Sequence, residues 1–398
     1  MTASSIHCSR TPSRLAGMLA PETNSFGVIR LMMAVAVLMS HSYWFTSGQG
    51  GSEPLYSWTG HSLGEHAVQV FFFLSGVLVT QSLLKSGSVL DFACGRTLRI
   101  FPGLTACVLF TALILGPSVS TLTLGQYLTE PELTSYVAKT FFLTTGSAGL
   151  PGVFTDVPLS GLVNVSLLTL KYEVLCYAGL GLVAAVGVLR EQTRAFAIAG
   201  LAILVFSIFI GPPKPIDDYS QLDNARYFTL FFGMGALACL LKKHIIISKF
   251  VLAPLFGFFV AAIGTRWAEL STALFLGYAT LYVATWTFGP LRRFTNEQDY
   301  SFGVYIYAGP IQQALIGLKL GLTPLALSFA ALPVALVLAV ISWNMIEKPA
   351  LLLRKRLIRI LNDFNSKYWP KGKLCESVRS RLEMRIAAVK YDTQQNVG

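Results

Sequence analysis

The segment FGVIRLMMAVAVLMSHSYWF, Phe26–Phe45, decides the class of fold. It is almost entirely apolar, and a helix of this length crosses the hydrocarbon core of a bilayer, which is roughly 30 Å thick. Similar runs recur along the 398 residues, of which 53% are hydrophobic and only 13% are charged. Soluble domains carry about a quarter charged residues. The sequence therefore predicts an all-α polytopic membrane protein.

Apolar windows of spanning length predict about ten transmembrane helices. The predicted spans are residues 26–46, 66–84, 100–119, 168–189, 195–212, 225–241, 246–264, 269–288, 301–320 and 324–346. The apolar stretch 136–149 contains Lys139 and leads into Thr, Gly and Pro residues, so we expect a re-entrant or interfacial piece there.

Three regions follow from these spans: an N-terminal segment 1–25, a transmembrane domain 26–349 and a basic tail 350–398. The N-terminal segment is polar and lacks the basic, apolar and small-residue order of a cleavable signal peptide. The tail contains LLLRKRLIRIL, Leu351–Leu361, which predicts an amphipathic helix on an anionic lipid surface. A surface for a cytoplasmic protein partner is the competing interpretation.

The basic residues predict the orientation of the chain. Most of the 31 Lys and Arg residues fall in loops on the side of the N-terminus and in the tail. The opposite side receives only Lys139, Lys214, Arg226, Arg266 and Lys319. Because cytoplasmic loops accumulate Lys and Arg, both termini are predicted to be cytoplasmic. The net charge of +11 is explained in this way and does not indicate a nucleic-acid partner.

The first span contains two ionisable residues, Arg30 and His41. Eleven helical steps of 100° amount to three turns plus about 20°, so both side chains leave one face of the helix, about 16 Å apart along its axis. Ionisable residues inside a membrane usually face a partner or a water-filled cavity. The alternative is that Arg30 reaches the inner headgroups and His41 lies at the outer interface.

Other polar residues lie in or beside predicted spans. Arg96 and Arg99 share one helical face after the second span, a pair that suits a polyphosphate and that a basic cytoplasmic loop also explains. Glu173 either orients a histidine or is an interfacial acid neutralised by Lys171. Tyr305 opens a ninth span rich in hydrogen-bonding groups, which indicates a polar cavity or polar helix packing.

The segment HSLGEH, His61–His66, lacks the spacing of a helical zinc site, and we expect its ionisable residues to be solvated in a loop. The six cysteines also show no ligand spacing. No metal is predicted.

Taken together, these segments resemble the membrane-bound acyltransferase 3 family, bacterial enzymes that acylate surface carbohydrates. Arg30 and His41 match the family's Arg-x10-His in the opening span. FFFLSGVLV, Phe71–Val79, matches FFxLSGxL and includes Ser75 and Gly76.

Four later motifs continue the resemblance in the same order. RTLRIFP matches the basic pair, and NVSLLTLKYEVLCY, Asn164–Tyr177, retains Glu173 but has Leu168 where the family has Trp. SFGVYIYAGP, Ser301–Pro310, has Ala308 where many members have His. The closing SWNMIEKP supplies the structural motif residues Trp343, Glu347 and Pro349.

The resemblance implies an enzyme of the bacterial inner membrane that transfers an acyl group, by default acetyl, from cytoplasmic acyl-coenzyme A to a hydroxyl of an exported carbohydrate. Arg96, Arg99 and Arg30 would bind the donor phosphates, and His41 would act as general base. Glu173 would orient His41 or stabilise its cation.

An oxyanion would be stabilised by Tyr305, Ser75 or a backbone amide beside Gly76. An acetylated His41 intermediate is the competing mechanism. The alternative function is a transporter of a lipid-linked sugar or an acylated intermediate.

Overall fold

The computed structural model describes residues 13–86, 88–144, 149–185, 200 and 220–368. The chain forms two compact units, Met1–Ala350 and Leu351–Gly398. The predicted span 195–212 and the end of the tail lie outside the described residues.

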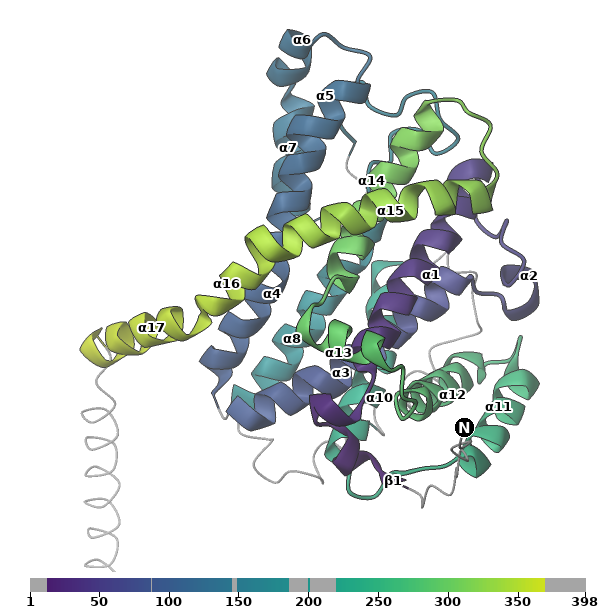
Figure 1. The fold of residues 1–398 in the computed structure, drawn as a ribbon, viewed down its shortest axis with the longest axis vertical. Helices are drawn as coiled ribbons and strands as arrows, with labels where there is room; N and C mark the ends of the chain where they lie inside the picture. Colours follow the sequence, from purple (N-terminus) through teal and green to yellow (C-terminus); the bar gives the residue numbers. More distant parts are fainter. Residues whose placement is uncertain (1–12, 87, 145–148, 186–199, 201–219, 369–398) are drawn as a thin grey trace, which may run out of the picture. The chain divides into compact units, whose positions relative to one another are not determined.

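The first unit is built from helices (Figure 1). Its N-terminal part comprises the 3₁₀ turns η1 and η2 and the helices α1 to α5, with these bounds: Leu15–Met18, Pro21–Thr23, Phe26–Ser47, Tyr56–Thr59, Leu63–Ser86, Val89–Phe110 and Gly116–Val119. A π-helical turn η3, Thr111–Leu115, joins α4 to α5.

The later elements α6, α7, η4, α8, α10, α11 and α12 have these bounds: Leu124–Thr129, Pro131–Phe141, Val165–Thr169, Leu170–Ala185, Gln221–Leu240, Lys249–Ala262 and Ala268–Val283. The elements α13, α14, α15, η7 and α16 follow, with these bounds: Pro290–Glu297, Ser301–Gly317, Pro324–Ser342, Trp343–Glu347 and Lys348–Leu352. Two strands, β1 (Ser13–Arg14) and β2 (Ile246–Ile247), form one short antiparallel pair. The described residues thus confirm the all-α class.

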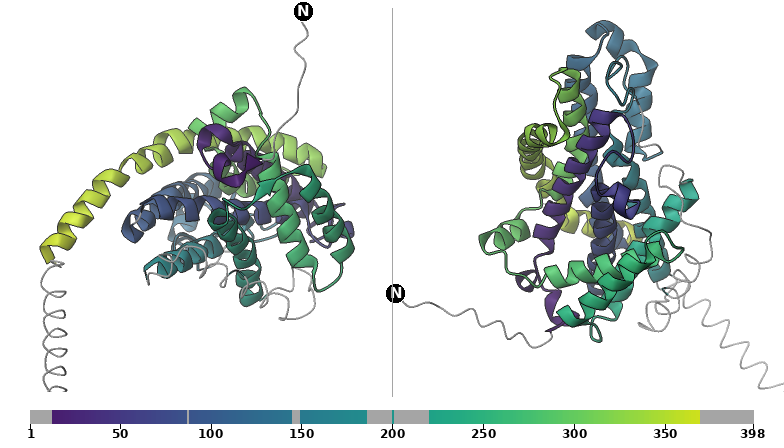
Figure 2. Two further views of the ribbon diagram at one scale, coloured as in Figure 1. Left: turned by 90° about the horizontal axis from the view of Figure 1, so that it is seen from below. Right: turned by 90° about the vertical axis from the view of Figure 1, so that its right-hand side faces the viewer.

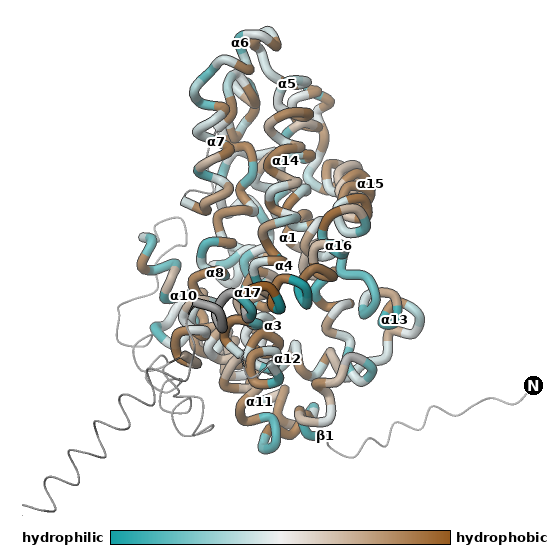
Figure 3. The backbone as a smooth tube through the Cα atoms, turned by 90° about the vertical axis from the view of Figure 1, so that its left-hand side faces the viewer, coloured by the Kyte–Doolittle hydropathy of each residue, from teal (hydrophilic) through white to brown (hydrophobic). Residues whose placement is uncertain are grey.

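Five helical segments are long and apolar enough to cross a membrane. They are Phe26–Ser47, Leu63–Ser86, Val89–Val119, Val165–Ala185 and Pro324–Leu361. The apolar character is continuous along α15, whereas α13 is hydrophilic (Figure 3). The larger count of about ten spans and the cytoplasmic placement of both termini stay predictions.

The third apolar helix begins earlier than the sequence indicated. We expected a span from residue 100, with the basic motif in a preceding loop, but α4 begins at Val89 and includes the whole motif. Ser88 caps its first turn by accepting a hydrogen bond from the backbone N–H of Asp91. Pro102 lies inside the helix and does not end it. Arg96 and Arg99 therefore project from a packed helix.

Helices α3 and α10 cross in close contact at two glycines. A Cβ atom at Gly76 would lie 2.1 Å from the backbone oxygen of Phe232, and one at Gly235 would lie 2.0 Å from that of Phe73. Both distances are far too short for a real side chain, so only glycine allows the two backbones to approach this closely. Gly76 consequently packs against α10.

Helix α1 lies beside α3, α14 and α15 (Figures 1 and 2). Gln312 of α14 is fully buried and donates hydrogen bonds to Leu38 O at 2.7 Å and to Ser42 Oγ at 2.6 Å. Ser328 of α15 reaches the same Ser42 hydroxyl at 2.9 Å. Gln312 of the predicted ninth span thus serves polar helix packing, one of the two expected outcomes.

The second unit contains helix α17, Arg354–Tyr368. The helix confirms the expected secondary structure of LLLRKRLIRIL from its arginine onward. Its contact with lipid remains a prediction.

Candidate active site

Two neighbouring cavities contain most of the residues that the sequence singled out. The first, here called the arginine chamber, is lined by Arg30, Val68, Phe71, Phe72, Ser75, Leu78, Val79, Arg96, Arg99, Ile100, Thr169, Leu170, Glu173, Tyr177, Ser301, Phe302 and Tyr305. Its volume is about 90 Å³. It brings together residues of α1, α3, α4, α8 and α14 that are far apart in the chain.

Asp299, which the sequence analysis did not single out, joins two of the three arginines. Its Oδ2 accepts a hydrogen bond from Arg30 Nη1 at 2.5 Å and another from Arg99 Nη2 at 2.5 Å. Burial by itself raises the pKa of Asp299, but the two guanidinium groups outweigh it and hold the pKa below its usual range. Ser301 Oγ also donates to the carboxylate at 2.6 Å. Asp299 thus fixes α1 and α4 to the start of α14.

The closing motif contacts the same arginine. Glu347 is buried, pairs with Arg99 at 3.2 Å, and accepts a hydrogen bond from Ser342 Oγ at 2.9 Å. The guanidinium of Arg99 also lies 5.4 Å from the ring of Trp343, within the range of a cation–π contact. Pro349, the last residue of the motif, lies in α16. The motif therefore holds Arg99 in place.

Arg96 lies beside the phenol ring of Tyr177, with its guanidinium carbon 5.9 Å from the ring centre. Glu173 lies in the same chamber, where it accepts hydrogen bonds from Ser75 Oγ at 3.0 Å and from Tyr177. Although both residues are described, Glu173 makes no hydrogen bond to His41. Its predicted task of orienting His41 is not met by this geometry, because α8 places the carboxylate beside the arginines.

The second cavity, here called the histidine chamber, is larger, with a volume of about 350 Å³. Its lining comprises Ser40, His41, Tyr43, Trp44, Gly50, Gly51, Ser52, Glu53, Tyr56, Ser62, Gly64, Glu65, Val68, Val165, Ser166, Leu168, Thr169, Tyr172, Asn224, Tyr227, Phe228 and Tyr305. Within the described part of the chain, the buried Nδ1 of His41 has no hydrogen-bond partner. A buried polar atom without a partner is often reserved for a substrate or a water.

The two chambers share the residues Val68, Thr169 and Tyr305. A hydrogen bond of 2.6 Å joins the hydroxyls of Thr169 and Tyr305 at this boundary. Arg30 lines one chamber and His41 the other, so the predicted shared face of the first helix looks onto both cavities. The structure therefore places the guanidinium and the imidazole on opposite sides of one polar junction.

Of the oxyanion candidates, Ser75 and Tyr305 line the arginine chamber, and Tyr305 lines both. Gly76 lines neither chamber among the residues described, because its α-carbon faces α10. The backbone amide candidate beside Gly76 is therefore the weakest of the three.

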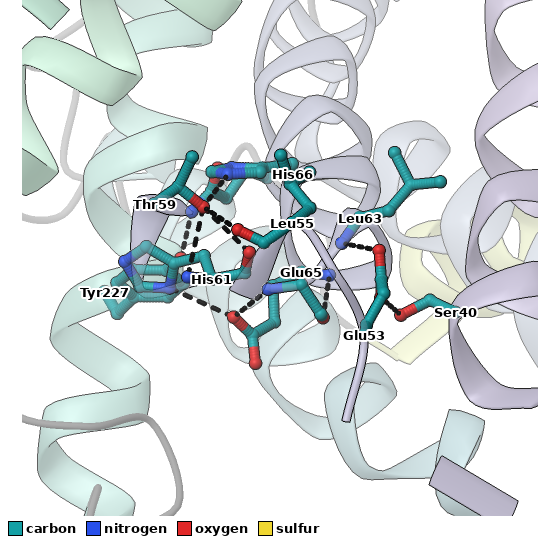
Figure 4. A network of polar contacts seen from close by, with 11 residues as sticks. Ser40, Glu53, Leu55, Thr59, His61, Leu63, Glu65, His66 and Tyr227 are labelled. Carbon is teal, nitrogen blue, oxygen red and sulfur yellow. Dashed lines mark hydrogen bonds and ion pairs between the residues drawn. The ribbon is translucent and has the colours of Figure 1, made fainter. Parts of the chain in front are cut away.

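The HSLGEH segment differs from the expected solvated loop (Figure 4). Its second histidine, His66, is buried, and its Nδ1 lies 2.8 Å from Gln69 Oε1. His61 Nδ1 lies 3.0 Å from Glu65 Oε2, and Glu65 lines the histidine chamber. The prediction failed because α3 begins at Leu63, so Glu65 and His66 belong to its first turn and not to a loop.

Glu53 lies in the segment between α1 and α3 and contacts both helices (Figure 4). Its Oε2 accepts from Ser40 Oγ at 2.5 Å, next to His41, and its Oε1 accepts from the backbone N–H of Leu63 at 2.9 Å. The carboxylate thereby connects the outgoing end of α1 to the first turn of α3. Among the described residues, no group of three His, Cys, Asp or Glu side chains forms a metal site.

Comparisons with known proteins identify the family of the chain. A family model described as an acyltransferase domain matches residues 24–344. The chain belongs to the acyltransferase 3 family. An O-acetyl transferase of Shigella phage Sf6 is 30% identical over 334 residues, covering 82% of this chain and 96% of that protein. Nodulation protein 10 of Rhizobium leguminosarum bv. viciae is 27% identical over 363 residues, covering 84% and 95%. No solved structure matches.

Proposed function

We propose that this acyltransferase transfers an acyl group, acetyl in the first instance, from acyl-coenzyme A to a hydroxyl of an exported carbohydrate. One observation carries the proposal: a cavity lined by three arginines adjoins a larger cavity lined by His41, whose buried Nδ1 has no hydrogen-bond partner among the described residues. The guanidinium groups suit the phosphates of a nucleotide donor, and the imidazole suits proton transfer from an acceptor hydroxyl.

On the donor side, the phosphates bind at Arg96, with Arg99 and Arg30 contributing from the network around Asp299. Charge-assisted hydrogen bonds from guanidinium to phosphate are strong and directional, which favours arginine over lysine at such a site. The arginine chamber is smaller than the range of about 300–1,000 Å³ typical of ligand pockets. Entry of the donor therefore requires lining side chains to move.

The reaction takes place at the junction of the chambers. The acceptor oxygen attacks the carbonyl carbon of the thioester while His41 removes the hydroxyl proton. The carbon–sulfur bond then breaks, the ester is formed, and the proton on His41 passes to the departing thiolate. The products are an acylated sugar and free coenzyme A. Tyr305 donates its phenol hydrogen to the developing oxyanion, because it borders both cavities.

Glu173 has a positioning role in this proposal. Its hydrogen bonds to Ser75 and Tyr177 fix two walls of the arginine chamber. Its negative charge also balances the guanidinium groups while no donor is bound. The acceptor hydroxyl reaches His41 without its help.

The two-chamber arrangement also supports a membrane-spanning route. With both termini in the cytoplasm, Arg30 lies toward the cytoplasmic end of α1 and His41 lies toward its outer end. A charged nucleotide then stays on the inner side while the acyl group reaches an acceptor on the outer side. The bacterial inner membrane supplies both compartments.

Transfer of label tests the proposal directly. Purified full-length protein in lipid nanodiscs receives acetyl-coenzyme A labelled in the acetyl group, together with a panel of bacterial surface oligosaccharides. We expect the label to appear as an ester on a sugar. Movement of a lipid-linked sugar across sealed vesicles without any ester would instead indicate a transporter. A stable acetyl adduct on His41, formed before acceptor is added, would replace direct attack by a two-step reaction.

A further inference from the structure

The histidine chamber differs from the arginine chamber in the sign of its charged lining. Two carboxylates, Glu53 and Glu65, line it, and no Lys or Arg occurs among its described lining residues. The two basic residues that adjoin lining residues in the sequence, Lys171 and Arg226, have contacts of their own. Lys171 lies 4.8 Å from the ring centre of Tyr172, and Arg226 forms hydrogen bonds of 2.7 and 2.8 Å with Glu269.

The two carboxylates have different tasks. Both oxygens of Glu53 are occupied, by Ser40 and by the backbone of Leu63, so this residue fastens the loop. Glu65 uses only Oε2, which meets His61 Nδ1 at 3.0 Å and accepts from the backbone N–H of Ser62 at 3.0 Å. Because a carboxylate only accepts hydrogen bonds, His61 Nδ1 carries the hydrogen in this contact.

The second oxygen of Glu65 is open to a ligand. The contacts of the Glu65 carboxylate within the described part of the chain are those to Oε2, and Glu65 is among the residues that line the cavity. The anchored Oε2 fixes the carboxylate plane, so Oε1 presents a preorganised acceptor to a hydroxyl group. Aromatic rings, including those of Tyr43 and Trp44, supply apolar surface in the same cavity for the C–H face of a sugar ring.

From this lining we propose that the acceptor is an uncharged sugar and that Glu65 sets this specificity, which rests on the proposed transfer to a carbohydrate. A neutral sugar gives a hydroxyl hydrogen to Glu65 Oε1. A uronic or other acidic sugar would bring a second negative charge beside Glu65 and find no Lys or Arg partner among the described lining residues. Burying a charge without a partner opposes binding, and the like charges repel.

A matched pair of probes tests the proposal. Methyl β-glucoside and methyl β-glucuronide share one ring and differ at C6, which is a neutral hydroxymethyl group in the first and a carboxylate in the second. Their dissociation constants are measured by saturation-transfer NMR on the full-length protein in nanodiscs at pH 7.5. We expect the glucoside to bind about tenfold more tightly than the glucuronide, because like charges meet in the chamber.

Substitution then assigns the preference to one residue. Glu65→Gln keeps the size and removes the charge, so we expect the preference to fall to about threefold or less, mainly through tighter binding of the glucuronide. Glu130→Gln, at an exposed position outside both chambers, serves as the matched control and should keep the wild-type ratio. A circular dichroism spectrum and a melting temperature for each variant identify any loss of fold, and Glu65→Ala provides a second removal of the charge.

Three results would overturn the proposal: equal or tighter binding of the glucuronide, an unchanged ratio in both Glu65 variants, or binding of neither sugar. Label transfer, measured in parallel on neutral and acidic oligosaccharides, separates this proposal from the one on function. Sugar discrimination without any acetyl ester contradicts the transfer reaction and leaves the specificity intact. Transfer to acidic and neutral acceptors alike contradicts only the specificity.

Discussion

The arginine and histidine chambers share a wall but are stabilised in opposite ways. In the arginine chamber, the guanidinium groups of Arg30 and Arg99 converge on Asp299, and Glu347 adds a second carboxylate. In the histidine chamber, His41 Nδ1 has no partner within the described structure, and the cavity is about 350 Å³ against about 90 Å³. The first arrangement suits holding charges in place, and the second leaves a base and a space for a reactant.

Removing the imidazole is expected to have the largest effect on activity. A general base contributes about 10²–10⁴-fold to the rate, so His41→Ala should lower kcat by that factor. Binding of coenzyme A, which depends on the other chamber, should stay within about twofold. The exposed His244→Ala is the control for losing a histidine. Near-normal acetyl transfer by His41→Ala would remove this residue from the chemistry.

Breaking the network around Asp299 should affect stability more than any other single change in the arginine chamber. Asp299→Asn leaves two partly buried guanidinium groups without their shared carboxylate, which we expect to cost roughly 2 kcal/mol. The melting temperature in detergent, followed by size-exclusion chromatography, measures the loss. Asp156→Asn removes an exposed pair with Lys319 and should leave the melting temperature nearly unchanged, because exposed ion pairs contribute little to stability.

The pH dependence of that stability provides a sharper check. The folded protein holds the pKa of Asp299 below its usual range, so the carboxylate stabilises the fold above the pKa of the unfolded chain. This contribution is lost as the pH falls below about 4 and through the folded pKa. The difference between wild type and Asp299→Asn should therefore be constant near neutral pH and narrow in acid. A difference independent of pH would contradict an ionised Asp299.

Replacing Arg96 should weaken donor binding, by a smaller factor than the loss of kcat expected for His41→Ala. Arg96→Ala removes one charge-assisted contact to phosphate, so we expect the KM for acetyl-coenzyme A to rise about tenfold with kcat nearly unchanged. Arg293→Ala removes an exposed arginine that pairs with Glu297 and should leave both constants at wild-type values. An unchanged KM in the Arg96 variant would place the phosphates elsewhere.

The shared wall distinguishes two neighbouring hydroxyls. Tyr305→Phe removes the proposed oxyanion donor and should lower kcat about tenfold, the lower end of the scale for one hydrogen bond to a charged group. Thr169→Val breaks the same 2.6 Å contact but keeps the phenol, so kcat should stay within about twofold. Equal losses in both variants would mean that the hydrogen bond, and not the phenol, matters at the junction.

The structure and the sequence agree best where the signal is local. The helical class and the first helix, Phe26–Ser47, follow from apolar runs whose length and period depend only on neighbouring residues. The start of α4 at Val89 was not predicted, because the charged residues of the basic motif interrupt the apolar run by which a spanning helix is recognised. Arg96 and Arg99 could still be identified, because their spacing is a property of one helix.

The rest of the candidate site depends on contacts between distant segments. Asp299 stands 269 positions from Arg30 and 200 from Arg99, and nothing in its immediate sequence marks it as their partner. From the sequence, Glu173 fitted a histidine-orienting carboxylate and an interfacial acid neutralised by Lys171 equally well, whereas α8 places it beside Ser75.

Hydropathy and helical periodicity are summed over a few consecutive residues, so the amino-acid order alone established a helical membrane protein with a cation and an imidazole on one helical face. Which carboxylate meets which cation depends on how helices cross, and a shift of one turn would exchange the partners. Only the packed fold could decide that Asp299 joins the arginines and that Glu65 faces the cavity of His41.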